Sequence, residues 1–312
     1  MSGSAEAERR SPTAPLDALS VAMGVSFAVI WSSAFTSAKI ALAYAPPFLM
    51  LGVRFALAGL LTVAVAAALG QSAPRDRRSW ALIGLFGLCQ NTLYLGLNFL
   101  AMTRVPAGLA AIIASALPLA VAGLGWLVFG ERLSRLALLG LATGFSGVVL
   151  IMSGRIAGGV DPAGVGLCLL GLLALSVATL ALRGAAAGGN VAMVVGLQML
   201  VGAVTLLPLG LAVESVSEIE PALPLLLAFA YTTLVPGVLA TLIWFALVRR
   251  IGATPASAFH LLNPALGVGI AAALLGETLS ALDWLGVAVV SAGIAAVQLS
   301  RRRSGAGAVS PR

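Results

Sequence analysis

A chain of 312 residues that is 60% hydrophobic and 9% charged, with a mean hydropathy of +1.06, does not fit the ordinary globular proteins, whose charged fraction is about 25%. The composition indicates a membrane protein, and 36 glycines suit helices that pack closely in lipid. The net charge of +7 does not indicate nucleic-acid binding, because the arginines are scattered one to three at a time between apolar segments and form no basic face.

The two cysteines provide no metal or redox motif. Cys89 and Cys168 lie inside apolar segments, with no CxxC and no His/Cys cluster at metal-ligand spacing. We interpret them as buried free thiols and expect no metal and no cofactor.

Charged residues divide the chain into ten apolar windows, each near the roughly 20 residues that a helix needs to cross a bilayer. Residues 1–18 are predicted to be a disordered cytoplasmic tail and residues 301–312 a basic cytoplasmic tail. The windows are approximately Leu19–Leu42, Pro47–Leu69, Trp80–Thr103, Ala107–Phe129, Leu136–Ser153, Gly164–Leu182, Val191–Val213, Leu223–Val248, Ala253–Leu275 and Trp284–Leu299. The sequence therefore predicts an all-α polytopic membrane protein with ten transmembrane helices.

The basic residues predict the orientation, because cytoplasmic loops carry an excess of Lys and Arg. With the N-terminus inside, 14 of the 18 basic residues fall on the cytoplasmic side, and Lys39, Arg104 and Arg155 fall outside. Arg54 lies within the second window. Both termini are therefore expected in the cytoplasm.

One pattern occurs twice, 146 residues apart. Sliding the sequence against itself aligns Pro118 with Pro264, Gly130-Glu131 with Gly276-Glu277, and Leu133-Ser134 with Leu279-Ser280. Each copy contains five windows, and an odd number reverses the direction in which the chain enters the membrane. We therefore expect two inverted five-helix repeats, 19–155 and 160–300, an architecture in which secondary transporters bind substrate near the midplane.

The sequence resembles the EamA-type members of the drug/metabolite transporter superfamily. The resemblance rests on the proline-centred fourth and ninth windows, each ending in Gly-Glu-x-Leu-Ser, and on the run Trp31-Ser-Ser-Ala-Phe35-x3-Lys39. It is greatest to the YddG-type amino acid exporters. It implies a bacterial inner-membrane protein whose fifth and tenth helices are peripheral and whose other helices surround a central cavity.

Pro118 and Pro264 are predicted to kink the fourth and ninth helices. A proline inside a helix removes one hydrogen bond and displaces the carbonyl of residue i−4, here Ala114 and His260. One interpretation is a pair of symmetry-related kinks that line the cavity and flex during transport. The other is a static kink satisfied by a neighbouring helix.

Polar and aromatic residues inside the windows are the candidates for substrate binding. His260, the only histidine, lies beside Asn263 on a face that also carries Ser257, where a hydrogen-bonded core histidine is the alternative. The third window carries four polar residues, which either line the cavity or hold helices together. The complete candidate set is Trp31, Ser32, Gln90, Asn91, Tyr94, Asn98, Ser115, Trp244, His260 and Asn263, with Pro118 and Pro264 for gating.

Arg54 is the basic residue that lies deepest in a window. A charge at that depth is costly, and the sequence leaves open whether it is paired or forms part of an anion-attracting vestibule.

These features predict an exporter of small metabolites, chiefly amino acids, that works by alternating access as a monomer. All 11 acidic residues fall in tails or connections, which favours a facilitator over a proton-coupled carrier. A carrier of phosphorylated or sugar-linked metabolites or of drugs is the first alternative. An intramembrane serine protease is the second, suggested by the GxSG sequence at Gly144–Gly147 and a histidine on a later helix.

Overall fold

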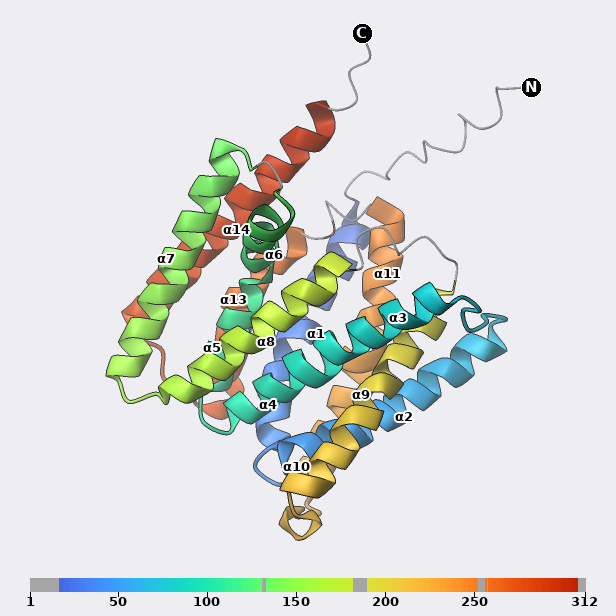
Figure 1. The fold of residues 1–312 in the computed structure, drawn as a ribbon. Helices are drawn as coiled ribbons and strands as arrows, with labels where there is room; N and C mark the ends of the chain where they lie inside the picture. Colours follow the sequence, from blue (N-terminus) through green and yellow to red (C-terminus); the bar gives the residue numbers. More distant parts are fainter. Residues whose placement is uncertain (1–16, 131–132, 182–189, 252–255, 257, 308–312) are drawn as a thin grey trace, which may run out of the picture.

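The computed structural model describes residues 17–130, 133–181, 190–251, 256 and 258–307, and every regular element in these ranges is helical (Figure 1). The elements are α1 (Ala18–Ala41), α2 (Pro47–Ala68), α3 (Arg77–Phe86), η2 (Gly87–Leu95), α4 (Gly96–Met102), α5 (Ala107–Ser115), α6 (Leu117–Phe129), α7 (Arg135–Ala157), α8 (Pro162–Ala181), α9 (Val191–Val213), η3 (Val216–Glu218), α10 (Leu223–Leu234), η4 (Val235–Leu239), α11 (Ala240–Ile251), η5 (Ala258–Leu262), α13 (Asn263–Leu275) and α14 (Ala281–Gly307).

The helices account for the ten predicted windows. Eight are long and apolar enough to cross a membrane, counting α3–η2–α4 and α10–η4–α11 as single spans. Helices α5 and α6 form one more span, bent by 41° at its break, and the ninth window contains the shorter apolar helix Phe259–Leu275. Residues 253–255 and 257 of that window lie outside the described residues. The predicted all-helical membrane fold is confirmed.

The two halves pack against each other through equivalent helices. Helix α2 packs along α9, α7 along α14, and α5 along α13, which are the second and seventh, fifth and tenth, and fourth and ninth spans. Likewise α1 contacts α10 and α11, while α8 contacts η2 and α4. If the first five spans are exchanged with the last five, each pair of packed spans becomes a pair that is also present, as two structural repeats require.

Helix α7 and helix α14 run antiparallel with their backbones in close contact. A Cβ on Gly293 would lie 2.4 Å from the Gly144 backbone nitrogen, so no side chain fits there. Gly140 faces Gly293, and Gly154 faces Leu282, which shows the opposite chain directions. This pair stands at one edge of the bundle (Figure 1), as expected for the peripheral fifth and tenth helices.

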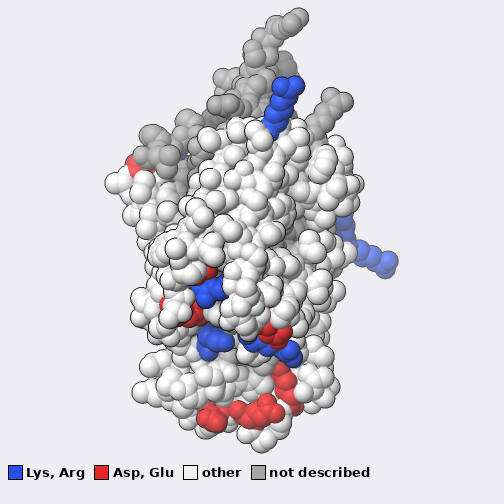
Figure 2. Space-filling model, turned by 90° about the vertical axis from the view of Figure 1, so that its left-hand side faces the viewer, with Lys and Arg blue, Asp and Glu red and all other residues white. Residues whose placement is uncertain are grey.

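The outside of the bundle is apolar. Leucine and valine side chains that are more than half exposed occur on most spans, for example Leu60, Leu127, Val149, Val204 and Leu226. On the face drawn in Figure 2, most visible charged side chains gather toward the end opposite the termini, and much of the remaining surface is uncharged. Such an exterior is stable in lipid and would be costly in water.

Both repeat prolines stand where a helix is interrupted. Pro118 is the second residue of α6, which follows the break after Ser115, and Pro264 is the second residue of α13, which follows the 3₁₀ turn η5. Two further irregular segments, η2 and η4, are π-helical and were not expected from the sequence. Segment η4 contains Pro236, whereas η2 has no proline.

Helix N-termini of one half are capped from the other half. The backbone N–H groups of Ala107 and Gly108, at the start of α5, donate to Glu277 Oε1 (2.7 Å) and Oε2 (3.0 Å). In the same way, the backbone N–H groups of Phe48 and Leu49, at the start of α2, donate to the two carboxylate oxygens of Glu214. A carboxylate satisfies two free N–H groups and the positive end of the helix dipole together. Glu131, the repeat partner of Glu277, lies outside the described residues.

Candidate functional site

An aromatic cluster forms where α1, α11 and η5 meet. The His260 ring lies 5.0 Å from the ring of Trp244, 5.3 Å from Phe27 and 6.1 Å from Trp31, measured between ring centroids. Phe27 and Trp31 are one helical turn apart on α1, so both present the same side to the histidine. Three spans far apart in sequence thus converge on His260.

Asn263 places a polar group beside this cluster. Its side-chain nitrogen lies 2.9 Å from His260 Nδ1, and its backbone carbonyl accepts a hydrogen bond from the Ser32 hydroxyl at 3.5 Å. Both Asn263 and Ser32 are buried. The side-chain oxygen Oδ1 of Asn263 is fully enclosed and has no hydrogen-bond partner among the residues that the structure describes. Buried acceptors are nearly always satisfied in native proteins, so this oxygen is a candidate contact for a ligand donor.

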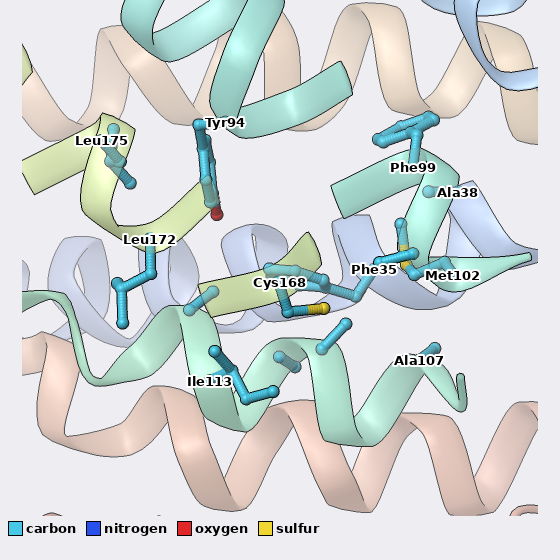
Figure 3. Packing of buried hydrophobic residues seen from close by; sticks show 14 of the residues in the cluster. Phe35, Ala38, Tyr94, Phe99, Met102, Ala107, Ile113, Cys168, Leu172 and Leu175 are labelled. Atoms are coloured by element: carbon cyan, nitrogen blue, oxygen red, sulfur yellow. The ribbon is translucent and has the colours of Figure 1, made fainter. Parts of the chain in front are cut away.

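The predicted residues of the third span lie at contacts with other helices. Asn91 donates from Nδ2 to the Gln198 carbonyl of α9 at 2.7 Å, and Asn98 donates to the Tyr94 carbonyl at 2.9 Å. Gly171 of α8 packs against the Asn98 amide. Figure 3 shows the Tyr94 ring directed into the buried cluster, toward the side where Cys168 and Leu172 lie. These positions show how the third span is held to α8 and α9.

The remaining predicted residues are placed as follows. Gln90 is partly exposed on the π-helical segment η2. Ser115 is buried at the end of α5 and donates to the Ala111 carbonyl at 2.7 Å, which satisfies its hydroxyl on its own helix. The structure therefore brings together Trp31, Ser32, Trp244, His260 and Asn263, and it does not bring Asn91, Asn98 or Ser115 into that group through any described contact.

Three features were missed or left unassigned in the sequence. Phe27 was missed, although its spacing of four residues from Trp31 is a signal in the sequence. A second polar contact joins α1 to α10, where the Ser33 and Tyr231 hydroxyls lie 2.7 Å apart and Thr232 donates to the Ser37 hydroxyl at 3.2 Å. Arg54 is buried with no ion pair among the described residues.

The aromatic cluster can recognise a positively charged group. The faces of Trp31, Trp244 and Phe27 carry the negative part of the ring quadrupole, which attracts an ammonium group within about 6 Å of the ring centroid. The free Asn263 oxygen can accept a hydrogen bond from the same group. The rings also offer apolar surface to a side chain.

The serine of the GxSG sequence is not arranged for catalysis. The Ser146 hydroxyl donates to the Thr143 carbonyl of its own helix at 2.8 Å, and the residue is exposed on the outside of α7. The neighbouring glycines Gly144 and Gly147 pack against α14. The sequence thus reflects helix packing.

The EamA-like transporter family matches residues 18–153 and 162–299, which together cover most of the chain in two segments. The chain belongs to this family. It is a membrane transporter and not an enzyme.

Relatives along almost the whole length agree with this assignment. The chain is 28% identical over 281 residues to the uncharacterized transporter YvbV of Bacillus subtilis, covering 90% of this chain and 92% of YvbV. It is 30% identical over 283 residues to the uncharacterized inner membrane transporter YedA of Escherichia coli, covering 88% of each. A probable amino-acid metabolite efflux pump of Salmonella typhimurium is 27% identical over 276 residues, covering 85% of this chain and 90% of the pump. The chain is thus a multi-pass bacterial membrane protein.

A solved crystal structure supports the fold. It covers 91% of this chain and 98% of its own, with a TM-score of 0.66 and 22% identity. At that identity the likeness concerns the arrangement of helices alone.

Proposed function

We propose that this transporter exports small zwitterionic metabolites, chiefly amino acids, from the cytoplasm by alternating access. The observation that carries the proposal is the buried, unpartnered Asn263 Oδ1 beside the ring cluster at His260, a combination that suits a substrate ammonium group. The similarity to proteins named as probable amino-acid metabolite efflux pumps supports the same substrate class.

The arrangement of charges supports a facilitator driven by the substrate gradient. The described acidic residues lie in connections or at helix ends, and most of them cap N-termini or pair with arginines, as Asp283 does with Arg155 at 2.9 Å. Proton-coupled carriers use carboxylates at membrane depth. The excess of arginines on the side of the termini supports an orientation with both termini in the cytoplasm.

The interrupted fourth and ninth spans are the proposed moving parts. Each has a break directly before its proline, and the ends of these spans meet at the Glu277 cap on α5. A helix break allows a change of direction without loss of further hydrogen bonds. We propose that Pro118 and Pro264 mark the hinges, and that one copy of the chain forms the complete transport path.

The experiment is counterflow in proteoliposomes. Purified protein is reconstituted with an excess of one unlabelled amino acid inside, and uptake of the labelled form is measured across an amino acid panel. The proposal expects transient accumulation of at least one amino acid above protein-free liposomes. Accumulation of sugar phosphates with none of any amino acid would overturn it in favour of a carrier of phosphorylated metabolites.

A further inference from the structure

Arg54 is a buried cation without a partner. It lies in α2, seven residues after Pro47, which places it about 10 Å along the helix axis from the helix start and inside the hydrocarbon thickness. The residue is 7% exposed, and its Nε is fully enclosed without an acceptor. No described residue makes a hydrogen bond or ion pair with its guanidinium group. Its one described contact is with the ring of the adjacent Phe55, 5.5 Å from Cζ to the centroid.

The other described basic side chains differ from Arg54. Arg104 pairs with Asp161 at 3.1 Å, Arg155 with Asp283 at 2.9 Å, and Arg250 with Asp17 at 2.5 Å. Lys39 donates from Nζ to the carbonyls of Met102 and Val105, which lie at the end of α4. The rest are exposed to solvent, namely Arg75, Arg77, Arg78 and Arg135. Among the side chains that the structure describes, Arg54 is therefore the one buried cation without a hydrogen bond or ion pair.

The guanidinium group faces an irregular part of the eighth span. A Cβ on Gly237, in the π-helical segment η4, would lie 3.7 Å from Arg54 Nη2 and 3.3 Å from the Thr232 carbonyl oxygen. The backbone of the eighth span therefore comes close to the tip of the arginine at Gly237. Single π-helical turns are frequent at functional sites. The hydroxyl of Thr232 donates to the Ser37 hydroxyl, so polar groups of α1 and α10 meet next to this segment.

A buried charge that lacks a fixed counter-ion costs free energy, and a protein keeps it only where something repays that cost. No carboxylate of the described residues reaches Arg54, which leaves its charge open to an anion that is not part of them. We propose that Arg54 binds the carboxylate group of the transported metabolite. This rests on the proposed function. The planar fork of arginine matches two carboxylate oxygens, which a lysine could not do.

The first measurement is thermal unfolding of the purified protein without any transport assay. Sodium acetate is compared with sodium chloride at equal ionic strength and with neutral acetamide. The wild type is expected to gain thermal stability from acetate only, Arg54→Gln to lose that gain, and Arg77→Gln, which removes an exposed arginine, to keep it. An equal gain in Arg54→Gln would overturn the proposal. So would a gain with inorganic phosphate or phosphatidylglycerol but none with acetate, because the counter-ion would then be another anion or a lipid.

The second measurement separates a binding role from a structural one. In the absence of ligand, Arg54→Met removes an uncompensated charge and is expected to raise the unfolding midpoint by about 2–4 °C. A lower midpoint would show that Arg54 holds the fold together and would overturn the proposal. Arg54→Lys keeps the charge but not the fork, and is expected to respond to acetate more weakly than the wild type.

Transport then distinguishes this inference from the proposed function. For an amino acid that the wild type carries, Arg54→Gln is expected to raise KM about 10- to 100-fold, as for loss of a charge-assisted hydrogen bond, while KM for the matching amino acid amide changes little. Equal changes for both would overturn the carboxylate subsite and leave the proposed function standing. If no amino acid is carried but acetate still stabilises through Arg54, the proposed function falls and the anion site remains.

Discussion

The side-chain nitrogen of Asn263 lies 2.9 Å from Nδ1 of His260. An amide nitrogen can only donate, so His260 Nδ1 accepts and carries no proton in this arrangement. The imidazole is then neutral, with its proton on Nε2. This pair leaves the Asn263 oxygen free, and it couples the protonation state of His260 to the orientation of the amide.

The neutral histidine predicts transport that does not require a proton gradient. Protonating Nδ1 would remove the acceptor that holds Asn263, so proton uptake would disrupt the binding site. We expect counterflow rates in proteoliposomes to be unchanged between equal pH on both sides and a gradient of one pH unit. His260→Gln, which keeps a polar group there, is expected to retain this insensitivity. Strict dependence on a gradient that is lost in His260→Ala would contradict the interpretation.

The Glu277 cap predicts a measurable contribution to stability. Glu277→Ala leaves the N–H groups of Ala107 and Gly108 without acceptors, and we expect a loss of about 0.5–2 kcal/mol, as for other helix caps. Glu277→Gln keeps one acceptor oxygen and is expected to lose less. Thermal unfolding in detergent measures both, with Glu218→Gln, at an exposed carboxylate, as the control. Equal midpoints for Glu277→Ala and the control would show that the cap does not stabilise the bundle.

The contact between α7 and α14 predicts intolerance of any side chain at Gly293. A methyl group there would lie 2.4 Å from the Gly144 nitrogen, so Gly293→Ala must push the helices apart, at about 1–3 kcal/mol. Gly123, in α6, has no atom within 4 Å of an added Cβ and is the matched control. We expect Gly293→Ala to lower the unfolding midpoint and Gly123→Ala to leave it unchanged. A tolerated alanine at position 293 would mean that the two helices lie farther apart.

The ion pair between Asp17 and Arg250 predicts a pH dependence confined to acid. The hydrogen bonds from Arg250 and Ser20 hold the pKa of the Asp17 carboxyl well below its usual value of 3.8. A lowered pKa contributes stability above the unfolded pKa and loses it as the pH falls. The difference in unfolding midpoint between wild type and Asp17→Asn should therefore be constant from pH 8 to about pH 5, begin to shrink as the pH falls below 3.8, and disappear only in stronger acid, below the lowered pKa of the folded protein. A difference that grows toward acid would contradict the assignment.

The spans could be predicted from the sequence because lipid imposes a length and an apolar composition on each of them. The prolines could also be predicted to interrupt the fourth and ninth spans, since Pro118 and Pro264 lack an N–H group. The π-helical segment η2 could not, because it contains no proline and no other residue that specifies a π-helical turn.

The partners of the polar residues could be predicted less well. The spacing of Asn91 and Asn98 indicates a shared face, but it does not say that one bonds to the Gln198 carbonyl and the other to the Tyr94 carbonyl. Trp31, Trp244 and His260 come from three spans, and their meeting depends on how the halves pack. The doubled Gly-Glu motif predicted the repeat, while the capping of α5 by Glu277 emerged only from the structure.

The central claim is that Asn263 and its aromatic neighbours recognise the ammonium group of an amino acid, and one measurement tests it most directly. Counterflow in proteoliposomes compares an amino acid with the 2-hydroxy acid of the same side chain, in the wild type and in Asn263→Leu. We expect the wild type to prefer the amino acid by about tenfold, as for one hydrogen bond from a charged group, and Asn263→Leu to lose that preference. The account would be contradicted if Asn263→Leu preferred the amino acid over the 2-hydroxy acid as strongly as the wild type does.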